Sequence, residues 1–235
     1  MNRRTFLLAA VLVLPGAPGR AGDTQTELWP EAQAFFRLGE RLRLHLLADV
    51  WYAPRSWTAD GAASDSEAEV GAHFDVTLKP IVRPRLRTRN WERERYAWAR
   101  VGYDYLWAPG GEQSHEHRGI VEVTGRVRLP GGLWAINRAR VDLRDKNGEQ
   151  SSRYRDRVTL ERETALFGLE TIPYASVEFL YDTRYDAWSE QRYQLGLEAV
   201  LDPRWRLESY YQRKEDQRSA PAHTNAIGLV VRYYH

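Results

Sequence analysis

Arginine is the residue whose number and spacing point most clearly to chemistry. Of the 34 basic residues only Lys79, Lys146 and Lys214 are lysines, so nearly all the positive charge is carried by guanidinium groups. These groups recur at every second position through much of 118–157, interleaved with carboxylates. A guanidinium pairs well with a carboxylate in a crowded space and binds anionic ligands equally well. The pattern therefore predicts a lattice of ion pairs or a site for a small anionic solute.

We assign this predicted charge lattice to the polar faces of several extended segments and give none of its members a catalytic role. Its residues are Arg118, Glu122, Arg126, Arg128, Arg138, Arg140, Asp142, Arg153, Arg155, Arg157, Glu161, Glu178 and Arg192.

Two other clusters contain the residue types that bind metals. His115 and His117 flank Glu116 and would share one face of a strand, but no third ligand can be placed beside them. The second cluster is acidic, and its spacing fits no known calcium loop. It consists of Asp60, Asp65, Glu67 and Glu69. We therefore predict no metal site, and the sequence indicates no cofactor.

Enzymatic activity is left open by the sequence but is not favoured. The chain contains no G-x-S-x-G, H-E-x-x-H, phosphate-loop or dinucleotide motif. Ser176, Asp182 and a histidine such as His117 could form a hydrolase site that acts on lipid, although nothing in their spacing requires it.

The elements that would position these side chains are β-strands. In 115–128, Arg118, Glu122 and Arg126 alternate with apolar residues, and the pattern repeats in 133–144 after a Pro-Gly-Gly turn. Alternation with a period of two predicts strands with one polar and one apolar face, joined here as a β-hairpin. Each arm has about ten to twelve residues, close to the roughly 9–11 that cross a bilayer when tilted.

The same alternation runs along most of the chain and predicts an all-β fold without a convincing amphipathic helix. The further predicted strands are 27–38, 41–51, 69–79, 94–107, 153–163, 174–182, 192–201, 204–214 and 226–235. Residues 80–93 are left as a connection or a strand edge. The count is about eleven, but bacterial single-chain barrels have even strand numbers, so we expect ten or twelve. The predicted fold is a single antiparallel up-and-down transmembrane β-barrel with a charged lumen.

The predicted connections alternate in length. Residues 130–132, 167–168 and 202–203 form short turns, whereas 108–115, 145–152, 183–190 and 215–224 are longer and polar. Short periplasmic turns and longer external loops are typical of outer-membrane barrels. If the carboxyl end lies in the periplasm, the later short turns fall on the periplasmic side and the later long loops on the external side, as expected.

The first 21 residues have the plan of a signal peptide. Arg3 and Arg4 precede an apolar run over 6–14, and small residues follow up to Ala21. The two arginines also fit a twin-arginine export motif, but an outer-membrane barrel must cross the inner membrane unfolded, which favours general secretion. Residues 22–235 have the length of one domain and contain no linker. We therefore predict a cleaved signal peptide over 1–21 and a barrel domain over 22–235.

The composition excludes several classes of protein. Cysteine is absent, so neither disulfides nor thiolate chemistry are expected. The formal charge is only +2 with both signs intermixed, which gives no basis for nucleic-acid binding. The mean hydropathy of −0.62 is too low for a helical membrane protein but not for a barrel, whose polar lumen offsets its lipid-facing side.

Short motifs spread over most of the chain from Trp29 onward carry a resemblance to a known family. They are Gly102-Tyr103-Asp104-Tyr105, Glu116-His117-Arg118, Asn137-Arg138-Ala139-Arg140, Arg153-Tyr154-Arg155-Asp156-Arg157, Glu178-Phe179 and Gln191-Arg192-Tyr193-Gln194-Leu195-Gly196-Leu197. In these residues the chain resembles a family of bacterial proteins of unknown function that are predicted outer-membrane β-barrels. The resemblance implies a fold and a location, and it implies no reaction.

Three functional hypotheses remain. The first is an outer-membrane barrel with a structural role or with narrow solute permeation, whose partners would be outer-membrane lipid, lipopolysaccharide, the barrel-insertion machinery and a small anionic solute. The second is an outer-membrane enzyme that modifies lipid or lipopolysaccharide. The third is a soluble periplasmic barrel that binds an apolar ligand, which requires apolar faces inside and charged faces outside.

Overall fold

The computed structural model describes residues 24–52, 66–80, 95–109, 114–217 and 222–235. The predicted signal peptide, the acidic residues Asp60 and Asp65, and most of the segment 80–93 lie outside these residues. Within the described ranges no helix has the length and apolar character needed to cross a membrane.

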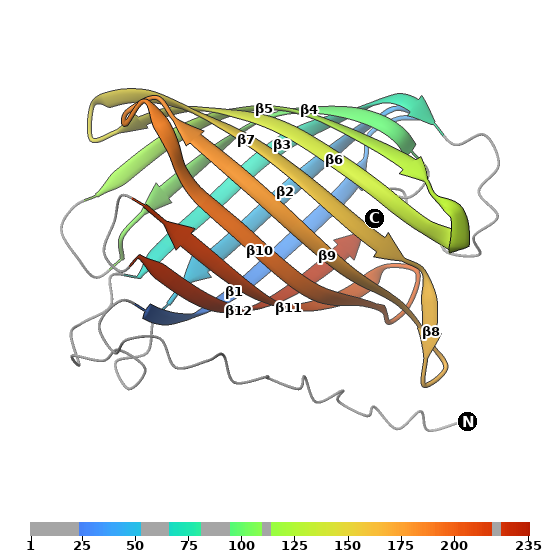
Figure 1. Ribbon diagram of the computed structural model, residues 1–235. Coiled ribbons are helices and arrows are strands. Elements are labelled where there is room, and N and C mark those ends of the chain that lie inside the picture. Colours follow the sequence, from blue (N-terminus) through green and yellow to red (C-terminus); the bar gives the residue numbers. More distant parts are fainter. Residues whose placement is uncertain (1–23, 53–65, 81–94, 110–113, 218–221) are drawn as a thin grey trace.

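Long strands make up almost all of the described chain (Figure 1). They are β1 (Thr24–Arg37), β2 (Leu42–Trp51), β3 (Glu67–Pro80), β4 (Arg95–Trp107), β5 (His115–Arg128), β6 (Leu133–Lys146), β7 (Glu149–Arg162), β8 (Thr164–Leu166), β9 (Leu169–Asp182), β10 (Ala187–Val200), β11 (Trp205–Asp216) and β12 (His223–Tyr234). A 3-10 turn, η2 (Pro130–Gly132), joins β5 to β6. All predicted strands are present, and most are longer than predicted.

The strands close into a barrel of eleven, to which the three-residue β8 adds only a short extension of the β7–β9 hairpin. Neighbours along the chain pair antiparallel, whereas β1 and β12 pair parallel, with Thr24 opposite His223 and Phe35 opposite Tyr234. The expectation of an even number was therefore wrong. It assumed antiparallel pairing everywhere, but a parallel pair at the closure admits an odd number, so the direct count of eleven strands was correct.

Because β1 and β12 run the same way, they begin at one end of the barrel and finish at the other. We call the end at which β1 begins with Thr24 the mouth end, and the end at which β12 finishes with Tyr234 the floor end. The β6–β7 turn and the β9–β10 connection lie at the mouth end, and the β5–β6 turn and the β8 hairpin lie at the floor end.

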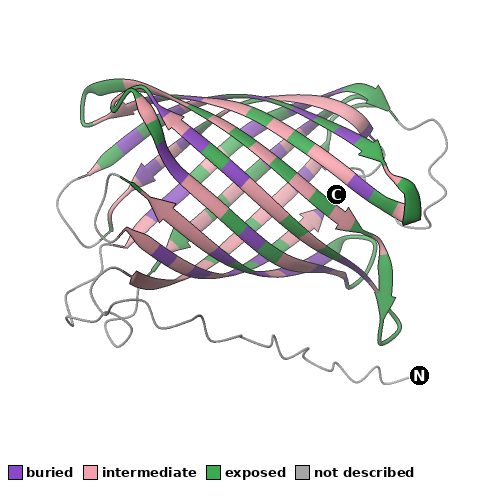
Figure 2. Cartoon of the chain, viewed as in Figure 1, coloured by how far each residue is buried: buried purple, intermediate pink, exposed green. Residues whose placement is uncertain are grey.

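The two faces of each strand are divided as the alternation predicts, with charge inside. In β5, Glu116, Arg118 and Glu122 are buried while Val121 and Val123 are about half exposed. Figure 2 shows buried and exposed residues alternating along the strands around the barrel. The soluble-barrel hypothesis required the opposite orientation, and the structure does not meet that requirement.

One predicted loop is wrong. Residues 145–152 form no long connection, because β6 and β7 continue to a two-residue turn at Asn147-Gly148. Both turn residues have positive φ, 54° and 88°, as a tight primed hairpin turn requires. The polar composition of this segment suggested a loop, although Asn-Gly is the strongest short hairpin signal. The β9–β10 connection is likewise shorter than the predicted 183–190, since β10 begins at Ala187.

Inward-facing glycines give bulky side chains room to lie flat against the wall. A Cβ on Gly228 would come within 2.0 Å of the Tyr210 ring, and one on Gly196 within 2.4 Å of the Tyr174 ring. Both rings therefore cover backbone of the neighbouring strand. The interior is thus filled by side chains packed along the wall as well as across it.

Candidate functional site: a charged cavity in the lumen

A cavity of about 1010 Å³ occupies the mouth-end half of the lumen. Its lining reaches the mouth-end strand residues Thr24, Trp51 and Lys146 and extends inward to His45, His73 and Arg232. This volume is comparable to the largest pockets that hold drug-sized ligands. The cavity is the main candidate for a binding site in the described part of the chain.

The wall formed by β6 and β7 presents positive charge to this cavity. Every charged residue that these two strands contribute to the lining is a cation, and no carboxylate of either strand lies among them. These residues are Arg138, Arg140, Arg144, Lys146, Arg153, Arg155 and Arg157. We call this set the basic wall.

Carboxylates behind the basic wall hold its arginines in place. Glu178 of β9 accepts hydrogen bonds from Arg138, Arg155 and Arg157 at 2.6, 2.9 and 3.0 Å. Asp182 accepts one from Arg144 at 2.7 Å and lies 3.4 Å from Arg153. Other carboxylates share these arginines, since Arg144 also donates to Glu116 at 2.7 Å and Arg155 lies 3.6 Å from Asp142. The guanidinium groups are thus paired from behind, and they are the charged groups that this wall presents to the cavity.

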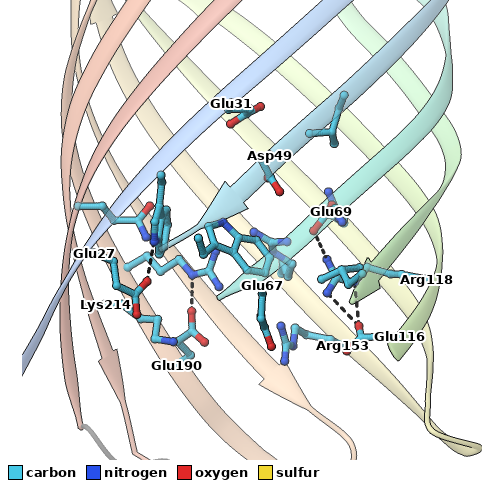
Figure 3. A pocket seen from close by; sticks show the side chains of 18 of the residues that line it. Glu27, Glu31, Asp49, Glu67, Glu69, Glu116, Arg118, Arg153, Glu190 and Lys214 are labelled. Atoms are coloured by element: carbon cyan, nitrogen blue, oxygen red, sulfur yellow. Dashed lines mark hydrogen bonds and ion pairs between the residues drawn. The ribbon is translucent and has the colours of Figure 1, made fainter. Parts of the chain in front are cut away.

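The wall formed by β1, β2 and β3 presents negative charge. Its charged lining residues, other than two histidines, are all carboxylates, namely Glu27, Glu31, Asp49, Glu67 and Glu69. We call this set the acidic wall. At its centre Glu31, Asp49 and Glu69 lie directly opposite one another on the three strands (Figure 3). Like charges at such positions repel, so this row costs stability unless a cation lies near it.

Within the described residues, Arg118 is the one side chain with a direct ion pair to this row of three carboxylates. Its guanidinium lies 3.3 Å from Glu69 and 2.9 Å from Glu116, as Figure 3 shows. The Oδ1 atom of Asp49 is buried and has no hydrogen-bond partner among the described residues. One carboxylate oxygen of the acidic wall, Oδ1 of Asp49, is therefore left unsatisfied by the described protein groups.

Two tryptophans border the row of carboxylates on its mouth side. Trp29 and Trp51 lie on neighbouring strands with ring centroids 6.0 Å apart, and both line the cavity. The indole nitrogen of Trp29 donates a hydrogen bond of 2.6 Å to Glu27. Aromatic rings beside carboxylates form a favourable surround for an organic cation.

A layer of packed side chains lies inside the barrel toward the floor end, on the neighbouring strands β11, β12, β1, β2 and β3. Phe35 stacks between His45 and Tyr234, with centroid separations of 4.4 and 4.8 Å. Arg43 lies over the Phe35 ring and Arg206 near the Tyr234 ring. We call Phe35, Arg43, Asp75, Arg206 and Tyr234 the floor, and none of these residues lines the cavity. All are nearly fully buried.

Charge within the floor is compensated by close pairing. Asp75 is fully buried and lies 2.6 Å from Arg100 and 3.6 Å from Arg95, besides pairing with Arg43. Arg206 donates to Glu198 at 2.9 Å. A buried charge is tolerated when it is paired and hydrogen-bonded in this way. The floor is therefore a cross-linked layer of rings and ion pairs.

Two buried histidines connect the floor to the cavity. The Nδ1 atoms of His45 and His73 lie 3.0 Å apart, and Nε2 of His73 lies 2.6 Å from Asp104. These contacts link β2, β3 and β4 on the lumen side of the barrel.

Most residues of the predicted charge lattice point into the lumen. Those that line the cavity are Arg118, Arg138, Arg140, Arg153, Arg155, Arg157 and Arg192. Glu122, Asp142 and Glu178 are buried, and Arg126 pairs with Glu161 at 2.8 Å. Arg128 is exposed near the floor end of β5, so it does not join the others.

The weaker candidates do not assemble into sites. His115 and His117 are exposed on the outer face while Glu116 between them points inward to Arg144. Ser176 and Asp182 lie on the polar face of β9, so neither approaches His117. No group of three or more potential metal ligands is present in the described ranges. Of the acidic cluster, Glu67 and Glu69 belong to β3.

The sequence did not predict that the carboxylates of the acidic wall lie together. Glu31 and Asp49 stand at polar positions of their strands, which is a local signal, but their alignment with Glu69 depends on the register between strands. His45 and His73 were missed as a pair for the same reason. The basic wall was found because its strands adjoin in sequence.

Comparison with known proteins adds no identification. No protein-family model and no curated protein matches this chain. The barrel and its lumen therefore carry the information on function.

Proposed function

We propose that this protein is an outer-membrane β-barrel that admits small polar solutes to its lumen and passes them through a narrow or gated path. The observation that carries the proposal is the orientation of the wall, with apolar side chains outward and an ion-paired cavity inside. A barrel in water would bear the cost of a large exposed apolar surface.

The dimensions of the strands support a membrane location. Most of the strands have 12 to 14 residues. At about 3.3 Å per residue and the usual tilt of roughly 40°, such strands give a wall about 30 Å high. This height suits the outward apolar band of roughly 25 Å that outer-membrane barrels present to lipid.

Outward aromatic side chains support the same orientation. Tyr103, Tyr154 and Trp188 are about half exposed toward the mouth end, while Trp205 is similarly exposed toward the floor end. Tyrosine and tryptophan favour the boundary between lipid and water. The resemblance to predicted outer-membrane barrels and the predicted signal peptide are consistent with this location.

The first test is the location of the full chain in a Gram-negative host. We expect recovery in the outer-membrane fraction and a band that migrates differently in heated and unheated samples on a detergent gel. Recovery as a soluble periplasmic protein would overturn the proposal.

The second test is single-channel conductance in planar bilayers. We expect small conductance from the unaltered protein, because the packed floor residues narrow the lumen, and larger conductance from the double variant Phe35→Ala/Tyr234→Ala, which removes two stacked rings. Phe74→Ala is the matched control, since Phe74 is exposed on the outer face. Equal conductance in all three proteins would show that the floor does not limit permeation.

A further inference from the structure

The acidic wall and the basic wall face each other across the lumen. In the order of strands around the barrel, β2 and β7 are separated by five positions in one direction and six in the other. The two strands therefore lie on opposite sides of the barrel. A solute in the cavity has carboxylates on one side, where Asp49 Oδ1 lacks a hydrogen-bond partner among the described residues, and guanidinium groups on the other.

From this opposition we infer that the cavity binds zwitterionic solutes, specifically short peptides with free termini. The inference deepens the proposed function, on which it rests, by naming the class of solute. An ammonium group would lie against Asp49 and its neighbours beside the tryptophans, and a carboxylate would lie against the arginines of β7. Both ends of such a solute find suitable partners, since guanidinium groups bind carboxylates strongly and aromatic rings bind ammonium groups.

The width of the lumen sets the length of the solute. Eleven strands spaced about 4.8 Å apart, at the usual tilt, give a barrel roughly 20 Å across between backbones. Side chains of both walls occupy part of this width. The opposite charges of a bridging solute must therefore lie well apart, as at the ends of a tripeptide, which spans about 10 Å when extended.

A purely anionic solute satisfies the geometry less well. It would bind the basic wall but would give the row of Glu31, Asp49 and Glu69 no cation beyond Arg118, and it would add further negative charge to the cavity. A purely cationic solute would bind the acidic wall but would provide no anion for the basic wall. Only a solute with both charges complements both walls.

The test is calorimetric titration of the detergent-purified full chain with trialanine. Acetyl-trialanine, which lacks the ammonium group, and trialanine amide, which lacks the carboxylate, serve as the comparison ligands. Loss of one charge-assisted contact typically weakens binding by roughly tenfold or more. We expect trialanine to bind, and each blocked peptide to bind at least about tenfold more weakly.

Two variants assign the ends of the peptide to the walls. Asp49→Asn should weaken trialanine binding while leaving acetyl-trialanine unchanged, because that peptide has no ammonium group to lose. Arg157→Gln should weaken trialanine while leaving the amide unchanged, and Glu178 would keep two other arginine partners. Glu40→Gln and Arg162→Gln are matched controls at exposed positions of a turn and a strand end. The heat-modifiable gel shift establishes that each variant is folded.

The outcomes separate this inference from the proposed function. Acetyl-trialanine binding as tightly as trialanine would show an anion site, and the amide binding as tightly would show a cation site; either result overturns the inference. A protein that conducts ions from the outer membrane but binds no trialanine also overturns it and leaves the proposed function intact. Binding by a protein absent from the outer membrane supports the inference and overturns the location.

Discussion

Glu178 is the residue on which the basic wall most depends. It is almost fully buried and accepts hydrogen bonds from arginines of both β6 and β7. Removing one partner of a buried charge cluster is costly because the remaining charges stay buried without compensation. Asp142, 3.6 Å from Arg155, offers only part of the missing negative charge.

We therefore predict that Glu178→Gln lowers the free energy of unfolding by roughly 3–5 kcal/mol. Urea unfolding in detergent, followed by tryptophan fluorescence, would measure the change. Glu149→Gln, at an exposed position beside the β6–β7 turn, should leave the midpoint unchanged. Equal midpoints for the two variants would refute the central role of Glu178.

At this scale the sequence predicted which side chains face inward more reliably than which ones meet. Parity along a strand places Glu178 and Arg157 on polar faces, and the structure confirms it. The contact of Arg144 with Asp182, across β7, depends on how far long side chains reach over an intervening strand. Alternation contains no information about that reach.

Among the elements, the β1–β12 pair is the least expected. The other neighbouring strands of the barrel pair antiparallel, and their pairing follows from short connections and matching faces. The parallel pair joins segments about 200 residues apart and has no turn to fix its register. The alternation of polar and apolar residues predicts the number of strands correctly. It does not predict the pairing of β1 with β12, because no local pattern encodes the partner of a first or last strand.

The absence of cysteine makes the register of this pair testable. Ala32 and Val231 are register partners on the outer face. Neighbouring Cα atoms at such positions lie within disulfide range. We expect Ala32→Cys/Val231→Cys to form an intramolecular disulfide, seen as a faster band on a non-reducing gel of denatured protein. Ala32→Cys/Tyr211→Cys, with the second cysteine on β11, is the control and should not; the converse result would contradict the parallel closure.

At the scale of the whole molecule, the odd strand number separates the two ends of the barrel domain. Thr24 lies at the mouth end and Tyr234 at the floor end. If the barrel spans a membrane, the membrane must therefore lie between them. An antiparallel barrel with an even number would place both on the same side.

We predict that epitope tags placed immediately before Thr24 and after His235 differ in their exposure to protease added to intact cells. One tag should be cleaved and the other protected, with both cleaved after the outer membrane is permeabilised. Equal protection or equal cleavage in intact cells would contradict the combination of parallel closure and membrane spanning.

The parallel closure also limits how the chain can be rearranged. In a barrel with an even number of strands, the last strand can be joined to the first by a short turn, and new ends can be opened at another loop. Here a joining segment would have to return the full height of the wall, about 30 Å, which takes roughly nine extended residues. Such a linker would have to run along the lipid-facing surface or through the charged cavity. The direction of a single strand pair thus removes the short joining turn on which circular permutation of a barrel would depend.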